Sequence, residues 1–150
     1  YDKSAFKFIR KNVFEIRSAN STSFVFEKGI PIVLISDKNV YNSMTWCAGI
    51  IAHHAFHAYA RIVKNRSKKT KKVPPLPGEK KIKAKKVYPD PLGVDYTGLD
   101  TIIAVEKRCS DFQMRVMENI GAPKSEIRYI KNRDPRDFSI SHDGAYSVNP

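Results

Sequence analysis

Three of the four histidines in this chain lie within five residues, at His53, His54 and His57. They belong to an apolar stretch that is predicted to be helical. Because an α-helix repeats every ~3.6 residues, His53 and His57 project from one face, one turn apart. Imidazoles at this spacing can bind a single Zn²⁺ ion. The sequence therefore predicts a zinc site, and the alternative is that both histidines are ordinary core or surface residues.

Glu106 is the carboxylate that best fits a third ligand. It lies in a second predicted helix among the apolar residues Ile102, Ile103, Val105 and Cys109. An ionised carboxylate on an apolar stripe is costly unless it is paired or bound to a metal ion. Two neutral imidazoles and one carboxylate would leave a fourth tetrahedral position for water, as in catalytic zinc sites.

Residues 45–57 resemble the active-site helix of zincin metallopeptidases, whose signature is His-Glu-x-x-His. In that family the two histidines bind zinc, and the Glu between them is the general base that activates the bound water. His53 and His57 match the signature, whereas His54 occupies the position of the Glu. The gluzincin branch takes its third ligand from a Glu on a later helix, and Glu106 is the best match.

The resemblance covers roughly residues 40–64 and 98–121. It implies a zincin-like fold and hydrolysis of a peptide or protein substrate by metal-activated water. An imidazole at position 54 is a poor base there, because the nearby dication opposes its protonation. We therefore expect hydrolysis to be weak or lost. Three interpretations stay open: a pseudo-peptidase that keeps the metal, an enzyme whose base lies elsewhere, and a site in which His54 itself binds metal. An engineered Glu-to-His change would give the same sequence.

The hydrophobic periodicity predicts one α+β domain over residues 1–150, and the resemblance implies that it is a zincin-like minimal domain. We expect an N-terminal helix, a short antiparallel hairpin or small sheet, a central metal-binding helix and a second long helix. The predicted ranges are 4–18 for the first helix, 23–27 and 30–36 for the hairpin strands, 43–64 for the central helix, 98–120 for the second long helix and 123–131 for a short last helix. Residues 65–97 should form a basic, Pro-containing insertion, and residues 134–150 an irregular tail.

The net charge of +12 is concentrated in one segment. Residues 61–86 contain 12 of the 27 Lys and Arg residues and one Glu, so they carry 11 of the 12 net positive charges. Such a segment can attract polyanions such as acidic cell-wall polymers or nucleic acid. A non-enzymatic polyanion-binding protein is thus the alternative function, and a solvated charged loop is the simpler interpretation. The candidate contacts are Lys68, Lys69, Lys71, Lys72, Lys80, Lys81, Lys83, Lys85 and Lys86.

Cys47 and Cys109 are the two cysteines of the chain, and they allow either a disulfide or two buried free thiols. If His53 and Glu106 meet on antiparallel helices, both cysteines lie toward the same end of the pair, where a bridge could form. A bridge would indicate an oxidising compartment and hence a secreted or cell-surface protein. No apolar run approaches the ~20 residues needed to cross a bilayer, so we expect no transmembrane segment. The sequence gives no indication of oligomeric state.

Overall fold

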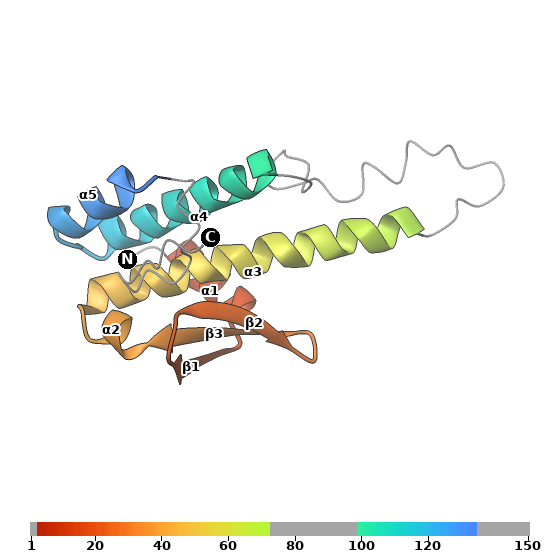
Figure 1. Ribbon diagram of the computed structural model, residues 1–150, viewed down its shortest axis with the longest axis horizontal. Coiled ribbons are helices and arrows are strands. Elements are labelled where there is room, and N and C mark those ends of the chain that lie inside the picture. The colour runs from red at the N-terminus through yellow and green to blue at the C-terminus, as the bar shows by residue number, and fades with distance from the viewer. Residues whose placement is uncertain (1–2, 73–98, 135–150) are drawn as a thin grey trace.

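A computed structural model describes residues 3–72 and 99–134 of the chain (Figure 1). The elements are α1 (Lys3–Asn12), β1 (Glu15–Ala19), β2 (Ser23–Glu27), β3 (Ile30–Ser36), α2 (Asp37–Val40), α3 (Met44–Lys72), α4 (Leu99–Asn119) and α5 (Lys124–Asn132). Helices combined with one small sheet confirm the predicted α+β class. Among the described helices, none is long and apolar enough to cross a membrane.

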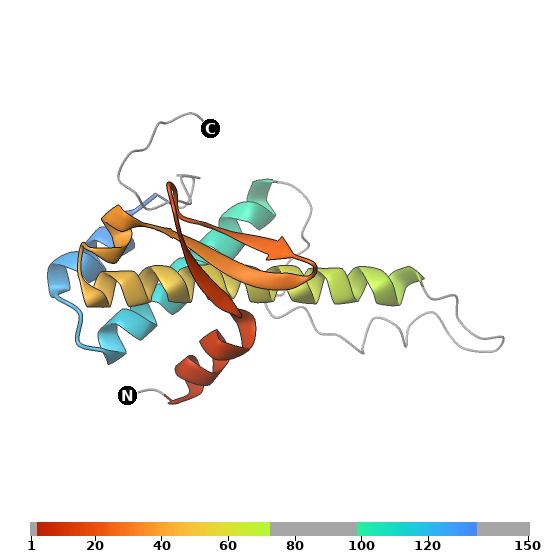
Figure 2. The same cartoon turned by 90° about the horizontal axis from the view of Figure 1, so that it is seen from below.

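The long helix α3 lies at the centre of the domain. Figure 1 shows it between the sheet on one side and α4 and α5 on the other, and Figure 2 shows α1 beside it on a third side. Because it is covered from several directions, its first half buries residues all round, including Ile50, Ala52, Ala55 and Ala58. A helix that is apolar on every side is expected to lie in a core.

The three strands are ordered β1-β3-β2. β2 and β3 are antiparallel, and the residues that join them, Lys28 and Gly29, have φ values of 51° and 79°. Two successive positive φ angles are typical of the two-residue type I′ turn that matches the twist of a hairpin. The predicted hairpin is therefore confirmed. It packs on α3 through Ile35, which forms a core cluster with Trp46 and Ile50.

The first helix is shorter than predicted, because its second half forms a strand. α1 ends at Asn12, so the predicted range 4–18 was wrong at its C-terminal end. Phe14 then donates its backbone N–H to the carbonyl of Pro31 at 3.0 Å, and β1 continues in parallel pairing with β3. Ile16 fits the helical spacing by coincidence, since it is 49% exposed in the strand. Hydrogen bonding to an available edge of β3 thus outweighs a local helical pattern.

The boundaries of α3 are partly as predicted. Ser43 caps the helix, because its Oγ accepts the backbone N–H of Trp46 at 3.0 Å. The helix continues past the predicted end near Lys64 to Lys72. The additional residues are good or tolerated helix formers, and no proline occurs between Lys64 and Pro74.

A glycine lets α3 and α4 pack closely. A Cβ atom at Gly49 would lie 2.5 Å from Sδ of Met117, well inside van der Waals contact. Met117 and Ile130 complete the core cluster that joins α3, α4 and α5. α4 is followed by Gly121 at φ 76°, the predicted C-terminal stop. The close approach of the two long helices is what brings their polar side chains together.

Candidate metal centre

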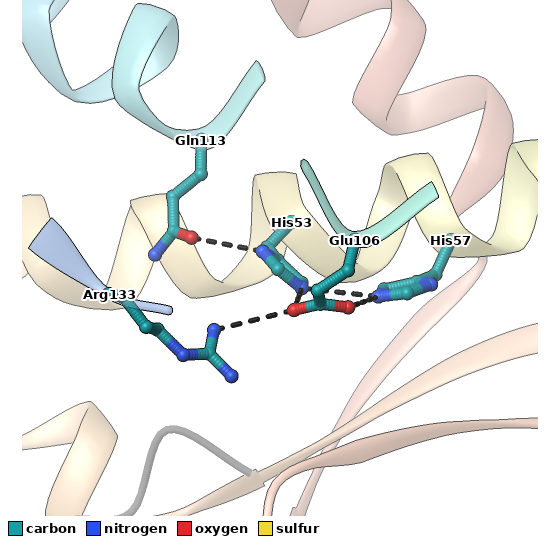
Figure 3. A network of polar contacts seen from close by, with 5 residues as sticks. All are labelled: His53, His57, Glu106, Gln113 and Arg133. Carbon is teal, nitrogen blue, oxygen red and sulfur yellow. Dashed lines mark hydrogen bonds and ion pairs between the residues drawn. The ribbon is translucent and has the colours of Figure 1, made fainter. Parts of the chain in front are cut away.

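His53, His57 and Glu106 meet between α3 and α4 (Figure 3). His53 Nε2 lies 3.1 Å from His57 Nε2 and 3.1 Å from Glu106 Oε1, and His57 Nε2 lies 2.9 Å from Glu106 Oε2. The two helices run antiparallel. His57 contacts Glu106, whereas His53, one turn earlier in α3, also contacts Gln113, which lies further along α4. The structure thus brings together the three residues that the sequence singled out.

The cluster is buried. His53 is 0% exposed and Glu106 is 5% exposed, and the His57 side chain is 14% exposed. Polar groups in such a place must find partners in the protein or bind an ion, because transfer from water without compensation is costly. The partners of each nitrogen and oxygen therefore decide what the cluster can do.

Gln113 fixes the orientation and tautomer of His53. Its Oε1 lies 3.0 Å from His53 Nδ1, and an amide oxygen can only accept a hydrogen bond. With this orientation of the amide, Nδ1 of His53 carries the proton and Nε2 is an acceptor that points at His57 and Glu106; with the amide turned over, the proton lies on Nε2. A histidine held in this way by an outer partner is typical of metal ligands.

The position of the His53 proton decides how the cluster is held together. The His57 ring can supply one proton from Nε2, either to Glu106 or to His53. With the His53 proton on Nδ1, the contact between His53 Nε2 and Glu106 Oε1, at 3.1 Å, joins two acceptors, whereas a proton on Nε2 makes it a hydrogen bond to the carboxylate. Burial lowers the pKa of His53 more than the contacts with Glu106 raise it. A cation placed among the three groups can bind both imidazoles and the carboxylate.

Glu106 is ionised, and Arg133 stabilises it. Burial opposes ionisation, but the contacts with His53 and His57 outweigh it and hold the pKa of the carboxyl well below its usual range. Arg133 Nη1 lies 3.4 Å from Glu106 Oε1, with its side chain 6% exposed. Arg133 follows α5, which is tied to the start of α3 because Glu126 accepts hydrogen bonds from Ser43 and Thr45. The last helix therefore delivers a buried guanidinium to the site.

A cysteine also reaches this cluster. His53, His57 and Cys109 place one ligand atom each within 4.8 Å of one another, and this group could hold a metal ion. Cys109 is buried, and burial raises the pKa of its thiol well above the ordinary value, with a further contribution from the charge of Glu106. Without a cation the thiol is therefore neutral, whereas the carboxylate is already charged.

His54 points away from the ligand atoms. Its ring is 0% exposed and packs near Phe24 of β2, with ring centroids 6.2 Å apart. The His54 ring centroid lies 5.3 Å from that of His53 and 6.0 Å from that of His57. In the structure His54 is a packing residue between α3 and the sheet.

The two cysteines are free thiols, so the alternative of a Cys47–Cys109 disulfide is wrong for this structure. Cys47 precedes His53 by six residues of helix, a rise of about 9 Å along the axis. Cys109 instead lies next to the imidazoles. The bridge was the argument for an oxidising compartment, so a secreted or cell-surface location stays a prediction without support from the structure.

The basic segment begins within α3. Lys68, Lys69, Lys71 and Lys72 belong to the end of α3, where the structure describes the backbone alone. The remaining candidate contacts lie outside the described residues: Lys80, Lys81, Lys83, Lys85 and Lys86. Binding of a polyanion therefore stays a prediction.

Gln113 and Arg133 were missed by the sequence reasoning. The sequence spacing could have predicted the role of Gln113, because this residue follows Glu106 by seven positions, or two helical turns, on the same apolar stripe. A second polar residue at that spacing indicates a shared polar site. No sequence pattern could have predicted the role of Arg133, because its position depends on how α5 folds back on α3.

The chain was compared with protein-family models, with curated proteins and with solved structures, and none of the three comparisons found a match.

Proposed function

We propose that this domain binds Zn²⁺ through His53, His57 and Glu106, in a metallopeptidase-like site that has lost most or all hydrolytic activity. The observation that supports it is the convergence of two imidazole nitrogens and an ionised carboxylate at 2.9–3.1 Å from one another, with His53 and Glu106 buried. A dication can bind all three groups.

The donor set favours zinc. Two imidazole nitrogens and a carboxylate suit Zn²⁺, whereas Mg²⁺ and Ca²⁺ prefer oxygen ligands. With Zn–N distances of about 2.0–2.1 Å, two ligands of a tetrahedral ion lie about 3.3 Å apart. The distances between the ligand atoms are 2.9–3.1 Å, so an expansion of a few tenths of an ångström admits the ion.

Peptide-bond hydrolysis is the chemistry that the resemblance to zincins implies. It needs a group beside the metal that takes a proton from bound water. His54 is neither a carboxylate nor placed among the ligand atoms, because it packs near Phe24. We therefore propose a metal-binding protein in which the catalytic function is weak or absent.

The metal content of the full chain, purified without added metal, tests this proposal by elemental mass spectrometry. We expect about one zinc per protein in the wild type and a large loss in His53→Ala and His57→Ala. His142→Ala is the matched control, since it removes the remaining histidine of the chain and should keep the metal. A wild type without metal, or equal zinc in all variants, would overturn the metal site.

The catalytic part of the proposal has its own test. We expect the wild-type protein to leave a generic unfolded protein substrate uncleaved over hours. Rapid cleavage that a chelator abolishes would show that a base other than the missing Glu operates, and that the site is a working peptidase.

A further inference from the structure

A fourth donor faces the same site from α4. Cys109 follows Glu106 by three residues and precedes Gln113 by four, so all three project from one face of the helix. Cys109 is 0% exposed. Its sulfur lies within 4.8 Å of one ring nitrogen of His53 and one of His57. The thiol therefore lies beside the imidazoles and comes from the same helix as the carboxylate.

The separation fits direct coordination. Zinc binds thiolate sulfur at about 2.3 Å and imidazole nitrogen at about 2.0–2.1 Å, which places sulfur and nitrogen about 3.5 Å apart in a tetrahedral site. From a separation of 4.8 Å or less, the sulfur must approach the imidazoles by about 1.3 Å at most. A small adjustment of one side chain supplies this.

The charges of the ligands favour a thiolate. Zn²⁺ with Glu106 as its only anionic ligand leaves one positive charge. Excess charge in a poorly solvated interior is unfavourable. When Cys109 binds, an S–metal bond replaces its S–H bond and the proton passes to solvent. The ion and its four ligands then carry no net charge.

The site is also poorly placed to bind substrate. A hollow of about 310 Å³ lies beside it and is lined by Glu106, Asp111 and Arg133 among others, but not by His53, His57 or Cys109. A catalytic zinc keeps one position open for water and substrate, whereas a structural zinc is enclosed by four protein ligands. Burial of His53 and of the thiol, with the His57 side chain only 14% exposed, matches the second class.

We infer that Cys109 is the fourth protein ligand, which completes a closed site of His53, His57, Glu106 and Cys109 around a structural metal ion. This inference rests on the proposed metal site and specifies its coordination. A closed site has no bound water to activate, so it has no use for a general base at position 54. It should accept Zn²⁺, Co²⁺ and Cd²⁺ and reject Mg²⁺ and Ca²⁺, because thiolate and imidazole are poor ligands for the latter two.

Cobalt substitution of the full chain tests the inference. Co²⁺ bound to a thiolate gives a sulfur-to-metal charge-transfer band in the near ultraviolet, in addition to the visible bands of a tetrahedral ion. We expect both features in the wild type and in Cys47→Ser, the matched control for the second thiol. Cys109→Ser should keep the visible bands and lose the charge-transfer band.

The possible results separate the two proposals. Visible bands without a charge-transfer band in the wild type would overturn Cys109 as a ligand and leave the metal site standing. Absence of any bound cobalt would overturn both. If Cys109→Ser does not fold, zinc X-ray absorption of the wild type decides the matter, since a sulfur neighbour at about 2.3 Å supports the inference and a shell of nitrogen and oxygen alone contradicts it.

Discussion

The domain buries two polar clusters against α3, and they are built in opposite ways. The Asn39 cluster (Thr22, Ser36, Asn39 and Trp46) lies where the sheet meets the start of α3, and each of its contacts joins a donor to an acceptor. Asn39 Nδ2 donates to Thr22 Oγ1 at 2.9 Å, Trp46 Nε1 donates to Asn39 Oδ1 at 2.8 Å, and the Thr22 hydroxyl donates to Ser36 Oγ at 3.2 Å. In the His53 cluster (His53, His57 and Glu106), on the α4 side, two imidazoles meet an ionised carboxylate, and the role of each ring nitrogen depends on the tautomer.

The difference indicates which cluster needs a ligand. A neutral network whose donors and acceptors match is complete in itself and holds the sheet on α3. Imidazole nitrogens that meet beside a buried, ionised carboxylate can instead hold a cation. We therefore expect removal of metal to affect the His53 cluster alone.

Metal removal should have the largest effect. If the ion is present at about 1,000 times its Kd, binding contributes about 4 kcal/mol to the free energy of unfolding. At about 2–4 °C per kcal/mol for a chain of this size, a chelator should lower the Tm by about 8–16 °C. Circular dichroism melts with and without chelator measure this. The chelator should lower the Tm of Asn39→Ala by the same amount. An unchanged Tm in the wild type would mean that the His53 cluster is complete without an ion.

Glu106→Gln should weaken metal binding by more than about 100-fold. Loss of a residue that only hydrogen-bonds to a metal ligand costs about 10–100-fold, and Glu106 is proposed to bind the metal itself. The change keeps the size of the side chain and removes the charge that faces both imidazoles. Competition with a chromophoric chelator measures the affinity. Glu118→Gln is the control, because Glu118 lies on the exposed part of the same helix. Equal affinity in the two variants would exclude Glu106 as a ligand.

Asn39→Ala should lower stability and leave metal binding unchanged. It removes the acceptor of the Trp46 indole N–H and one donor to Thr22, which should lower the free energy of unfolding by about 1–3 kcal/mol. Urea denaturation measures the loss, and metal analysis should give unchanged zinc. A parallel loss of metal would show that the two clusters are coupled through α3 rather than independent.

Gln113→Leu should lower metal affinity by about 10–100-fold, because His53 loses the acceptor that fixes its tautomer. Gln113→Glu retains an acceptor at that place and should bind metal at least as well as the wild type. Both affinities can be measured by the same chelator competition. Wild-type affinity in Gln113→Leu would show that the ring is oriented by other contacts.

The smallest expected effect is on hydrolysis. His54→Glu alone should give little or no cleavage of an unfolded protein, because Cys109 still fills the fourth position of the metal. His54→Glu combined with Cys109→Ala opens that position and should give measurable, chelator-sensitive cleavage. Full activity in the single variant would indicate that the position was already open.

The sequence predicted much of the fold because its signals are local. Ser43 as a cap, Lys28-Gly29 as a hairpin turn and Gly121 as a helix stop each act within a few residues. The first helix was predicted too long because Ile16 suits a helix locally, whereas its partner in β3 lies far along the chain. A long-range pairing leaves no local mark, so β1 could not be read from periodicity.

Local and long-range information contribute to the candidate site in the same way. Sequence alone determined that His53 and His57 share one face of a helix, and that Glu106 needs a partner, since both follow from helical repeat and burial cost. Which side of α3 meets α4, and therefore that Cys109 rather than Cys47 reaches the imidazoles, was decided by the close packing that Gly49 permits against Met117. Helix periodicity is a property of neighbouring residues, but the contact of two helix faces is chosen by the packing of the whole domain.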